Sequence, residues 1–252
     1  MITREVRILM RKEWRQLLRS RSALLTALLF PILFLLILPG TQMLAFTFAP
    51  SSLEMDQLPA NVPLPPGLVD IGDDPKLLLR NLMLPLFMMI GGLIVPSVTA
   101  NYTMIAEREN RTIELLVGLP VRVGQILLAK LLVIVLLAGA VTLTIFVIDT
   151  ALILILGIGS VGTVVALLLL LVCSLAYSTA SALLISLLAR DFRTANNLSG
   201  ALLAPIIIVS VLLLIGLPGM FATIVLAAIF ALAAAVAVLI ALRVVTFERL
   251  LR

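Results

Sequence analysis

The chain has 252 residues, of which 62% are hydrophobic and 12% charged, and its formal net charge is +5. A soluble domain is close to half apolar and a quarter charged, so this composition excludes an ordinary water-soluble fold. Histidine is absent and Cys173 is the single cysteine, which removes His-dependent catalysis, intramolecular disulfides and thiolate metal sites. The basic residues cluster beside apolar stretches, so we interpret the positive charge as a topology signal and expect no nucleic-acid partner.

Residues 1–21 combine an apolar stripe with many basic side chains. The apolar residues recur at helical spacing from Val6 to Leu18, and arginine and lysine occupy the remaining positions. This pattern predicts an amphipathic helix in the cytoplasmic interface, with its basic face toward anionic lipid headgroups. Topological anchoring alone is the alternative interpretation.

Six apolar stretches are long enough to cross a hydrocarbon core about 30 Å thick. The sequence therefore predicts an all-α membrane protein with six transmembrane helices that form one transmembrane domain. The spans are expected at residues 22–46, 75–106, 124–156, 161–189, 196–216 and 220–242. No cleavage site follows the basic leader, so we expect the first span to be retained.

The basic residues are distributed unevenly among the connections. Sixteen of the 18 fall in the amino-terminal segment, the second and fourth connections, and the tail at residues 243–252. Because positive residues stay on the cytoplasmic side, both termini are expected there, in the cell membrane. The exceptions, Lys76 and Arg80, adjoin a proline-rich loop at residues 47–74, which we expect to be external.

The second span is expected to begin before the bilayer core. Asp74 followed by Pro75 is typical of a helix N-cap with proline in the first helical position. Further along the same span, Pro85 and Pro96 predict kinks.

Residues 107–120 form a charged connection with interleaved apolar residues. Glu107 and Arg111 are four apart with the acid first, a favourable pair on a helix, and Gly118 and Pro120 end the pattern. A short cytoplasmic helix that exposes apolar side chains indicates docking onto a soluble partner. A solvated turn between spans is the alternative.

This connection resembles the cytoplasmic loop of the type-two permeases of ATP-binding-cassette transporters. That loop typically reads Glu-x-Glu-x-Gly-Thr-x-Glu-x-Leu-Leu, followed by a proline and then Gly-Lys. Arg111 and Ala129 stand where the family often has glycine, while the six-span plan and the short external loops extend the resemblance over the whole chain. The matching residues are Glu107, Glu109, Thr112, Glu114, Leu116, Pro120 and Lys130.

The resemblance implies that residues 1–21 are an elbow helix and that residues 107–120 are a coupling helix seated in a groove of a separate ATPase. ATP and Mg would bind that ATPase and no cofactor would bind this chain, which contains no Gly-x-x-x-x-Gly-Lys-Ser/Thr phosphate loop. A minor contact is expected in the loop at residues 190–195, although a plain positive loop explains that segment as well. The expected coupling residues are Glu107, Arg108, Glu109, Arg111, Thr112, Ile113, Glu114, Leu116 and Phe192.

Family members line their pathway with the second and fifth helices, so the uncharged polar residues of those spans are the candidates for substrate contact. Interhelical hydrogen bonding is the alternative role for them. Asp149 is expected near the outer end of the third span as a solvated interfacial residue. The candidates are Ser97, Thr99, Asn101, Tyr102, Thr103, Asn196, Asn197 and Ser199.

Small residues recur every four positions in two spans. Both stripes predict close helix packing. They consist of Ser174, Ser178, Ala182 and Ser186 in the fourth span and of Ala227, Ala231 and Ala235 in the sixth.

These patterns together predict a permease subunit, not an enzyme, that dimerises with itself or a paralogue and binds ATPase subunits. An ion-coupled secondary transporter or channel is the main alternative, and it lacks the intramembrane charges that ion coupling usually needs. An intramembrane enzyme is disfavoured by the missing histidines and by the absence of clustered carboxylates within the spans.

Overall fold

The computed structural model describes residues 10–12, 14–15, 25, 28–48, 74–109, 123–188 and 192–244. Within these ranges the chain is helical and contains no strand. Six helices are long and apolar enough to cross a membrane, as the sequence predicts. In the amino-terminal segment, Arg11, Lys12, Trp14 and Arg15 are helical and exposed.

The first two spans each combine a π-helical and an α-helical part. In the first, η1 (Ile32–Ile37) continues into α3 (Leu38–Phe48). In the second, α5 (Pro75–Leu78), η3 (Leu79–Met83) and α6 (Leu84–Glu109) follow one another without a break. The other spans are α8 (Val123–Ile155), α9 (Val161–Leu188), α10 (Phe192–Gly216) and α11 (Gly219–Val244).

The second span begins where the sequence predicts. The Lys76 amide donates a hydrogen bond to the Asp74 carboxylate at 2.9 Å, and the Leu77 amide donates to the Asp74 carbonyl at 3.0 Å. Asp74 is therefore the N-cap, and Pro75 occupies the first helical position, where its missing N–H costs nothing. Downstream, η3 lies directly before Pro85, which cannot donate to the carbonyl four residues back, and a wider π turn accommodates that loss.

The turn between α8 and α9 is closed by a Schellman motif. Gly157 adopts φ +63°, the Ile158 amide donates to the Ile153 carbonyl at 3.0 Å, and the Gly157 amide donates to the Leu154 carbonyl at 3.3 Å. Ile153 and Ile158 are both buried in one core cluster, which is the apolar contact that accompanies this motif. The connection is thus short and uncharged, as the sequence predicts.

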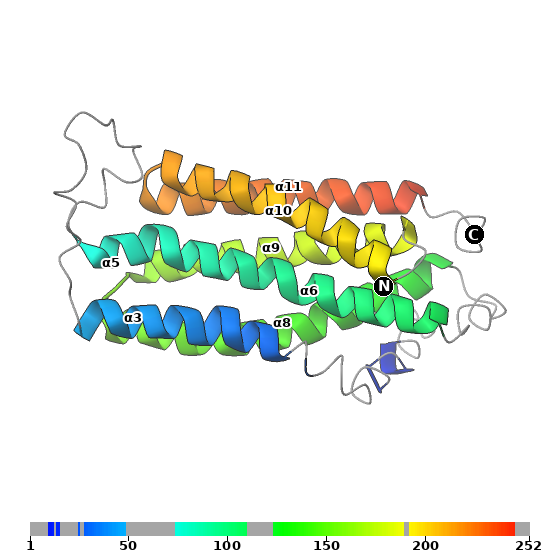
Figure 1. Cartoon of the computed structure of the whole chain (residues 1–252), viewed down its shortest axis with the longest axis horizontal. Coiled ribbons are helices and arrows are strands. Elements are labelled where there is room, and N and C mark those ends of the chain that lie inside the picture. Colours follow the sequence, from blue (N-terminus) through cyan, green and yellow to red (C-terminus); the bar gives the residue numbers. More distant parts are fainter. Residues whose placement is uncertain are drawn as a thin grey trace.

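The helices run alternately in opposite directions, so their ends gather at two ends of the bundle (Figure 1). One end, which we name the Pro75 end, also holds Phe48 and the turns before Val161 and Gly219. We name the opposite end the Glu109 end. The Glu109 end holds the ends of α6, α9 and α11 and the starts of α8 and α10. Connections that the sequence places on one membrane side thus lie at one end.

The helix that carries the fifth span begins earlier than the sequence predicts. The span is expected from residue 196, and the membrane-length apolar stretch begins at Asn197. However, α10 itself begins at Phe192, inside the loop expected at residues 190–195. Hydropathy marks where side chains become apolar, but backbone hydrogen bonding continues a helix into the polar residues that precede that point.

The central helix is α9, which packs against α6, α8, α10 and α11. Its small-residue stripe is buried as predicted, with Ser174, Ser178 and Ala182 all at 0% exposure. Gly92 of α6 abuts the Ser174 hydroxyl so closely that an added Cβ would overlap it. The two backbones therefore approach closely along this stripe.

The corresponding stripe of α11 is buried only in part, although α11 packs against α9. Ala227 is buried, but Ala231 and Ala235 are exposed. Residue size and hydropathy do not decide which side of an apolar helix faces a neighbour within the chain. The face of α11 that is buried alternates steps of three and four, through residues 223, 227, 230, 234 and 237.

Candidate coupling surface, pathway and cavity

The predicted coupling segment begins inside α6. This helix runs unbroken from the second span through Glu107, Arg108 and Glu109, and α8 begins at Val123. The side chains of Glu107, Arg108 and Glu109 lie outside the described part, as do Arg111, Thr112, Ile113, Glu114 and Leu116 entirely. The first three residues of the expected coupling segment are thus joined to the second span as one continuous helix.

Phe192 is the first residue of α10. The fold brings the start of α10 to the Glu109 end of the bundle, near the end of α6 (Figure 1). The two segments that the sequence assigns to ATPase contact therefore share one end, although the Phe192 side chain lies outside the described part.

Ser97, a pathway candidate, is 4% exposed and faces α9. Its hydroxyl lies 2.9 Å from the Ser178 hydroxyl, and Ser178 in turn donates to the Leu93 carbonyl of α6. These contacts correspond to the alternative role of interhelical hydrogen bonding. They join α6 to α9 at the place where small residues already allow close packing.

The remaining pathway candidates lie toward the Glu109 end. Within α10, Asn197 is exposed and Ser199 is buried, and α10 packs against α6. The second and fifth spans are therefore neighbours in the bundle. The side chains of Thr99, Asn101, Tyr102, Thr103 and Asn196 lie outside the described part.

Asp149 of α8 contradicts the expectation of a solvated interfacial residue. It is 0% exposed, and neither carboxylate oxygen accepts a hydrogen bond from the described residues. The core cluster that contains residues of η1, α3 and α9 also includes Ile145, Phe146 and Ile153. These three residues lie one turn from Asp149 on the same face of α8. Asp149 lies along α8 where it was predicted, but its side chain faces the neighbouring spans instead of solvent.

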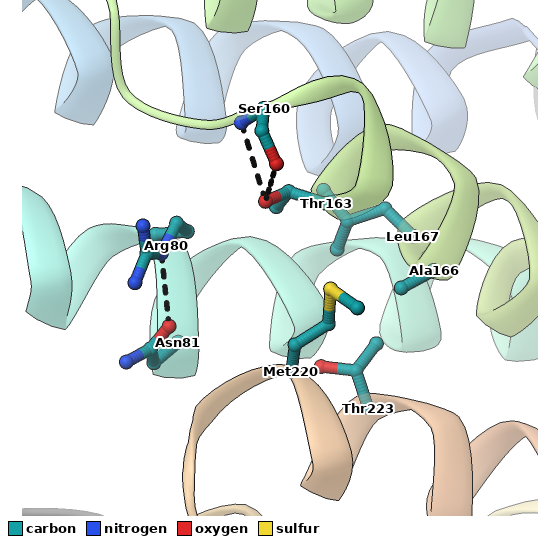
Figure 2. Close-up of a pocket in the computed structure, with 8 residues that line it drawn as sticks. All are labelled: Arg80, Asn81, Ser160, Thr163, Ala166, Leu167, Met220 and Thr223. Carbon is teal, nitrogen blue, oxygen red and sulfur yellow. Dashed lines mark hydrogen bonds between the residues drawn. The ribbon is translucent and has the colours of Figure 1, made fainter. Parts of the chain in front are cut away.

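A cavity of about 170 Å³ with both polar and apolar lining residues lies at the Pro75 end of the bundle (Figure 2). Residues from η3, α9, α11 and the turn before α9 surround it, and none of them is acidic. We call it the Arg80 cavity. Its lining residues are Arg80, Asn81, Ser160, Thr163, Ala166, Leu167, Met220 and Thr223.

The Arg80 side chain is half-buried at the edge of this cavity, and its Nε donates a hydrogen bond to the Asn81 side-chain oxygen at 3.1 Å. Across the cavity, the Ser160 amide donates to the Thr163 hydroxyl at 3.3 Å, and Figure 2 shows this pair facing Met220 and Thr223. Sequence reasoning missed the cavity. The available signal was that each polar lining residue stands within the first turns of a span.

Among the described residues, no three His, Cys, Asp or Glu side chains are grouped to hold a metal ion. Comparison with protein families finds one match, to the family described as ABC-2 family transporter protein, over residues 7–227. Comparisons with curated proteins and with solved structures find no match. The family match covers five of the six spans and the whole segment between α6 and α8.

Proposed function

The chain belongs to the ABC-2 family of transporter proteins, and from this premise we propose that it is the membrane permease of an ATP-driven exporter. As a member of this family it is a transport subunit without a catalytic domain. Separate ATPase subunits bind ATP and Mg and hydrolyse the nucleotide. The chain supplies the pathway and receives the mechanical work at its cytoplasmic end.

The continuity of α6 is the observation that carries this proposal. The helix extends from Leu84 to Glu109, so it links the pathway candidates around Ser97 to the first residues of the coupling segment. A helix transmits a push or tilt along its axis, because its backbone hydrogen bonds resist compression. Closure of the ATPase subunits would therefore reorient α6 directly, rather than through a flexible hinge at residue 106.

The fifth span supports a second permease copy as partner. Only 17% of the α10 span is buried within the chain, compared with 56% of the second span. Leu202, Ile208 and Leu212 are among its exposed apolar residues. We place α10 at the contact between two copies, where α6 and α10 of both copies enclose the pathway. A paralogue could take the place of the second copy.

A charge reversal in the coupling segment tests the ATPase partnership. We expect Glu114→Lys to abolish copurification of the ATPase subunit while membrane insertion stays normal, because the groove would meet a like charge. Glu248→Lys is the matched control, since it makes the same change in the carboxyl-terminal tail. Equal ATPase recovery with both variants would refute the coupling role.

Cysteine cross-linking tests the place of α10. In a Cys173→Ala background, Leu212→Cys is expected to form a disulfide-linked dimer in membranes. Ile224→Cys is the control, because it is also exposed and lies at a similar depth in α11. Failure of Leu212→Cys to cross-link to itself or to a paralogue, or equal cross-linking by both variants, contradicts the assignment.

Asp149 is the one observation that favours the alternative of ion-coupled transport. Buried carboxylates in membrane spans often carry protons or ions. Transport by reconstituted protein separates the two possibilities. The exporter requires ATP and its ATPase and tolerates Asp149→Asn, whereas an ion-coupled transporter works without ATP and fails with this variant.

A further inference from the structure

The Arg80 cavity offers hydrogen-bond donors without acidic partners. Nε of Arg80 donates to the side-chain oxygen of Asn81. The terminal guanidinium nitrogens of Arg80 and the amide nitrogen of Asn81 then remain as hydrogen-bond donors. Neither group has a further partner among the described residues. Asn81 is 8% exposed, so its amide group is held at the cavity wall rather than in bulk solvent.

The threonines of this cavity differ from threonines elsewhere in the described helices. Thr142, Thr144 and Thr179 each donate their hydroxyl to the carbonyl four residues back. Thr223 is 3% exposed and makes no such bond within the described residues, although Gly219 stands four residues before it in α11. Its hydroxyl, like the Ser160–Thr163 pair, remains available to a ligand.

Two helix starts add to the positive potential of the same cavity. Ser160 directly precedes α9, and Met220 is the second residue of α11. The first-turn amides of both helices lack intrahelical partners, and the helix dipole places partial positive charge there. Together with the Arg80 guanidinium, these groups favour an anion and disfavour a cation.

We propose that the Arg80 cavity binds a phosphate group carried by an amphipathic molecule. Arg80 forms the charge-assisted hydrogen bonds to the phosphate oxygens, and the Asn81 amide and the Thr223 hydroxyl donate to the remaining oxygens. The volume of about 170 Å³ exceeds the roughly 30 Å³ of one water several-fold. A headgroup of phosphate size therefore fits, whereas a long sugar chain does not.

The depth of the cavity and its apolar wall indicate that the molecule is a lipid-like ester. The spans of α9 and α11 begin at Val161 and Gly219, so the cavity lies at the level where a bilayer places its phosphates. Ala166 and Leu167 line its inner side and are themselves buried. Phe221 follows the lining residue Met220 in α11 and is 58% exposed. An acyl chain can lie against Phe221 outside the cavity while the phosphate occupies it.

The test measures binding to the full chain without an ATPase, so its outcome is independent of the proposed coupling. Native mass spectrometry of delipidated protein with phosphatidylglycerol is the lipid arm, and calorimetry with inorganic phosphate is the soluble arm. Arg80→Gln is expected to weaken phosphatidylglycerol binding about tenfold or more. Lys76→Gln is the control, because it removes a positive charge one turn away, outside the cavity.

Thr223→Val is a second variant, because valine has nearly the shape of threonine but lacks the hydroxyl. It is expected to weaken phosphatidylglycerol binding about threefold. Circular dichroism checks that both variants retain their helices. A loss of phosphatidylglycerol binding in these variants supports the proposal. Binding of inorganic phosphate without binding of phosphatidylglycerol overturns it, because the cavity would then take a soluble anion.

Three further results overturn the proposal. One is the absence of binding in both arms, and another is an equal loss in Arg80→Gln and Lys76→Gln. The third is binding that emerges only after Asp70→Asn and Asp73→Asn, because the cavity would then serve a carboxylate of the adjoining loop.

Discussion

The spans α9 and α10 are both strongly apolar, yet they occupy different environments. Half of the α9 span is buried within the chain, compared with 17% of the α10 span. In α9 the small residues Ser174, Ser178 and Ala182 contact neighbouring helices. In α10 the branched residues Ile208 and Leu212 remain exposed.

The difference shows that apolarity alone does not decide which helices meet in a membrane. Lipid tails are as apolar as leucine, so no hydrophobic force drives one span against another. Close approach of backbones, dispersion contacts and interhelical hydrogen bonds decide instead. The α9 sequence permits such approach, whereas α10 keeps bulky side chains for lipid or a second subunit.

The largest expected effect comes from matched leucine truncations. Leu170→Ala removes a fully buried side chain between α6, α9 and α11, and should cost about 2–5 kcal/mol of unfolding free energy through the cavity it leaves. Leu212→Ala in α10 should cost less than about 0.5 kcal/mol. Reversible unfolding in mixed micelles, followed by circular dichroism, measures both. Similar losses of unfolding free energy in the two variants would contradict the difference between α9 and α10.

Glycine substitutions should give opposite signs at the two helices. Gly92→Ala introduces a methyl group against Ser174, and overpacking should destabilise the fold by about 1–3 kcal/mol. Gly200→Ala in α10 meets no atom within 4 Å. This substitution should leave the midpoint of unfolding unchanged or raise it, since alanine is more favourable than glycine in a helix by about 1 kcal/mol. Destabilisation by Gly200→Ala in the isolated chain would count against an open α10 face.

Asp149 is an exception within the central packing, because its carboxylate is buried and has no hydrogen-bond partner in the part of the chain that the structure describes. Asp149→Leu removes this unsatisfied group, and should raise the unfolding free energy by about 1 kcal/mol or more. Thermal unfolding in detergent, compared with Leu143→Asp at an exposed α8 position, provides the measurement. A lower midpoint for Asp149→Leu would indicate that the carboxylate has a partner in the assembled transporter.

The smallest expected effect is the loss of one interhelical hydrogen bond. Ser178→Ala removes the contacts of the hydroxyl with Ser97 and Leu93, and should cost about 0.6 kcal/mol, the average for such bonds in membranes. Ser210→Ala, at a buried α10 position, provides the comparison. A cost of several kcal/mol for Ser178→Ala alone would mean that hydrogen bonding, rather than close packing, holds α6 to α9.

Much of the candidate site could be placed from the sequence because its signals are local. The Asp74–Pro75 cap was predicted correctly, and the polar residues after Ser97 belong to a helix that continues into the coupling segment. The family match over residues 7–227 agrees with the resemblance of residues 107–120. The individual coupling and pathway roles stay predictions.

The Arg80 cavity could not be predicted in the same way. Its walls come from η3, α9 and α11, which lie far apart in the sequence. Arg80 alone resembles any basic residue at a span end, and Thr223 alone resembles any polar residue near a turn. The cavity and its hydrogen-bond donors exist only because the fold brings these residues together.

The sequence by itself determined the all-helical class, the six spans and the short external loops, because each follows from local hydropathy, capping and backbone preference. The tertiary structure alone decided which face of each helix is buried. It placed Asp149 inside the bundle, exposed Ala231 and Ala235, and made α9 central. The physical reason is that lipid and protein interiors are equally apolar, so hydropathy cannot distinguish a face that contacts lipid from one that contacts another helix.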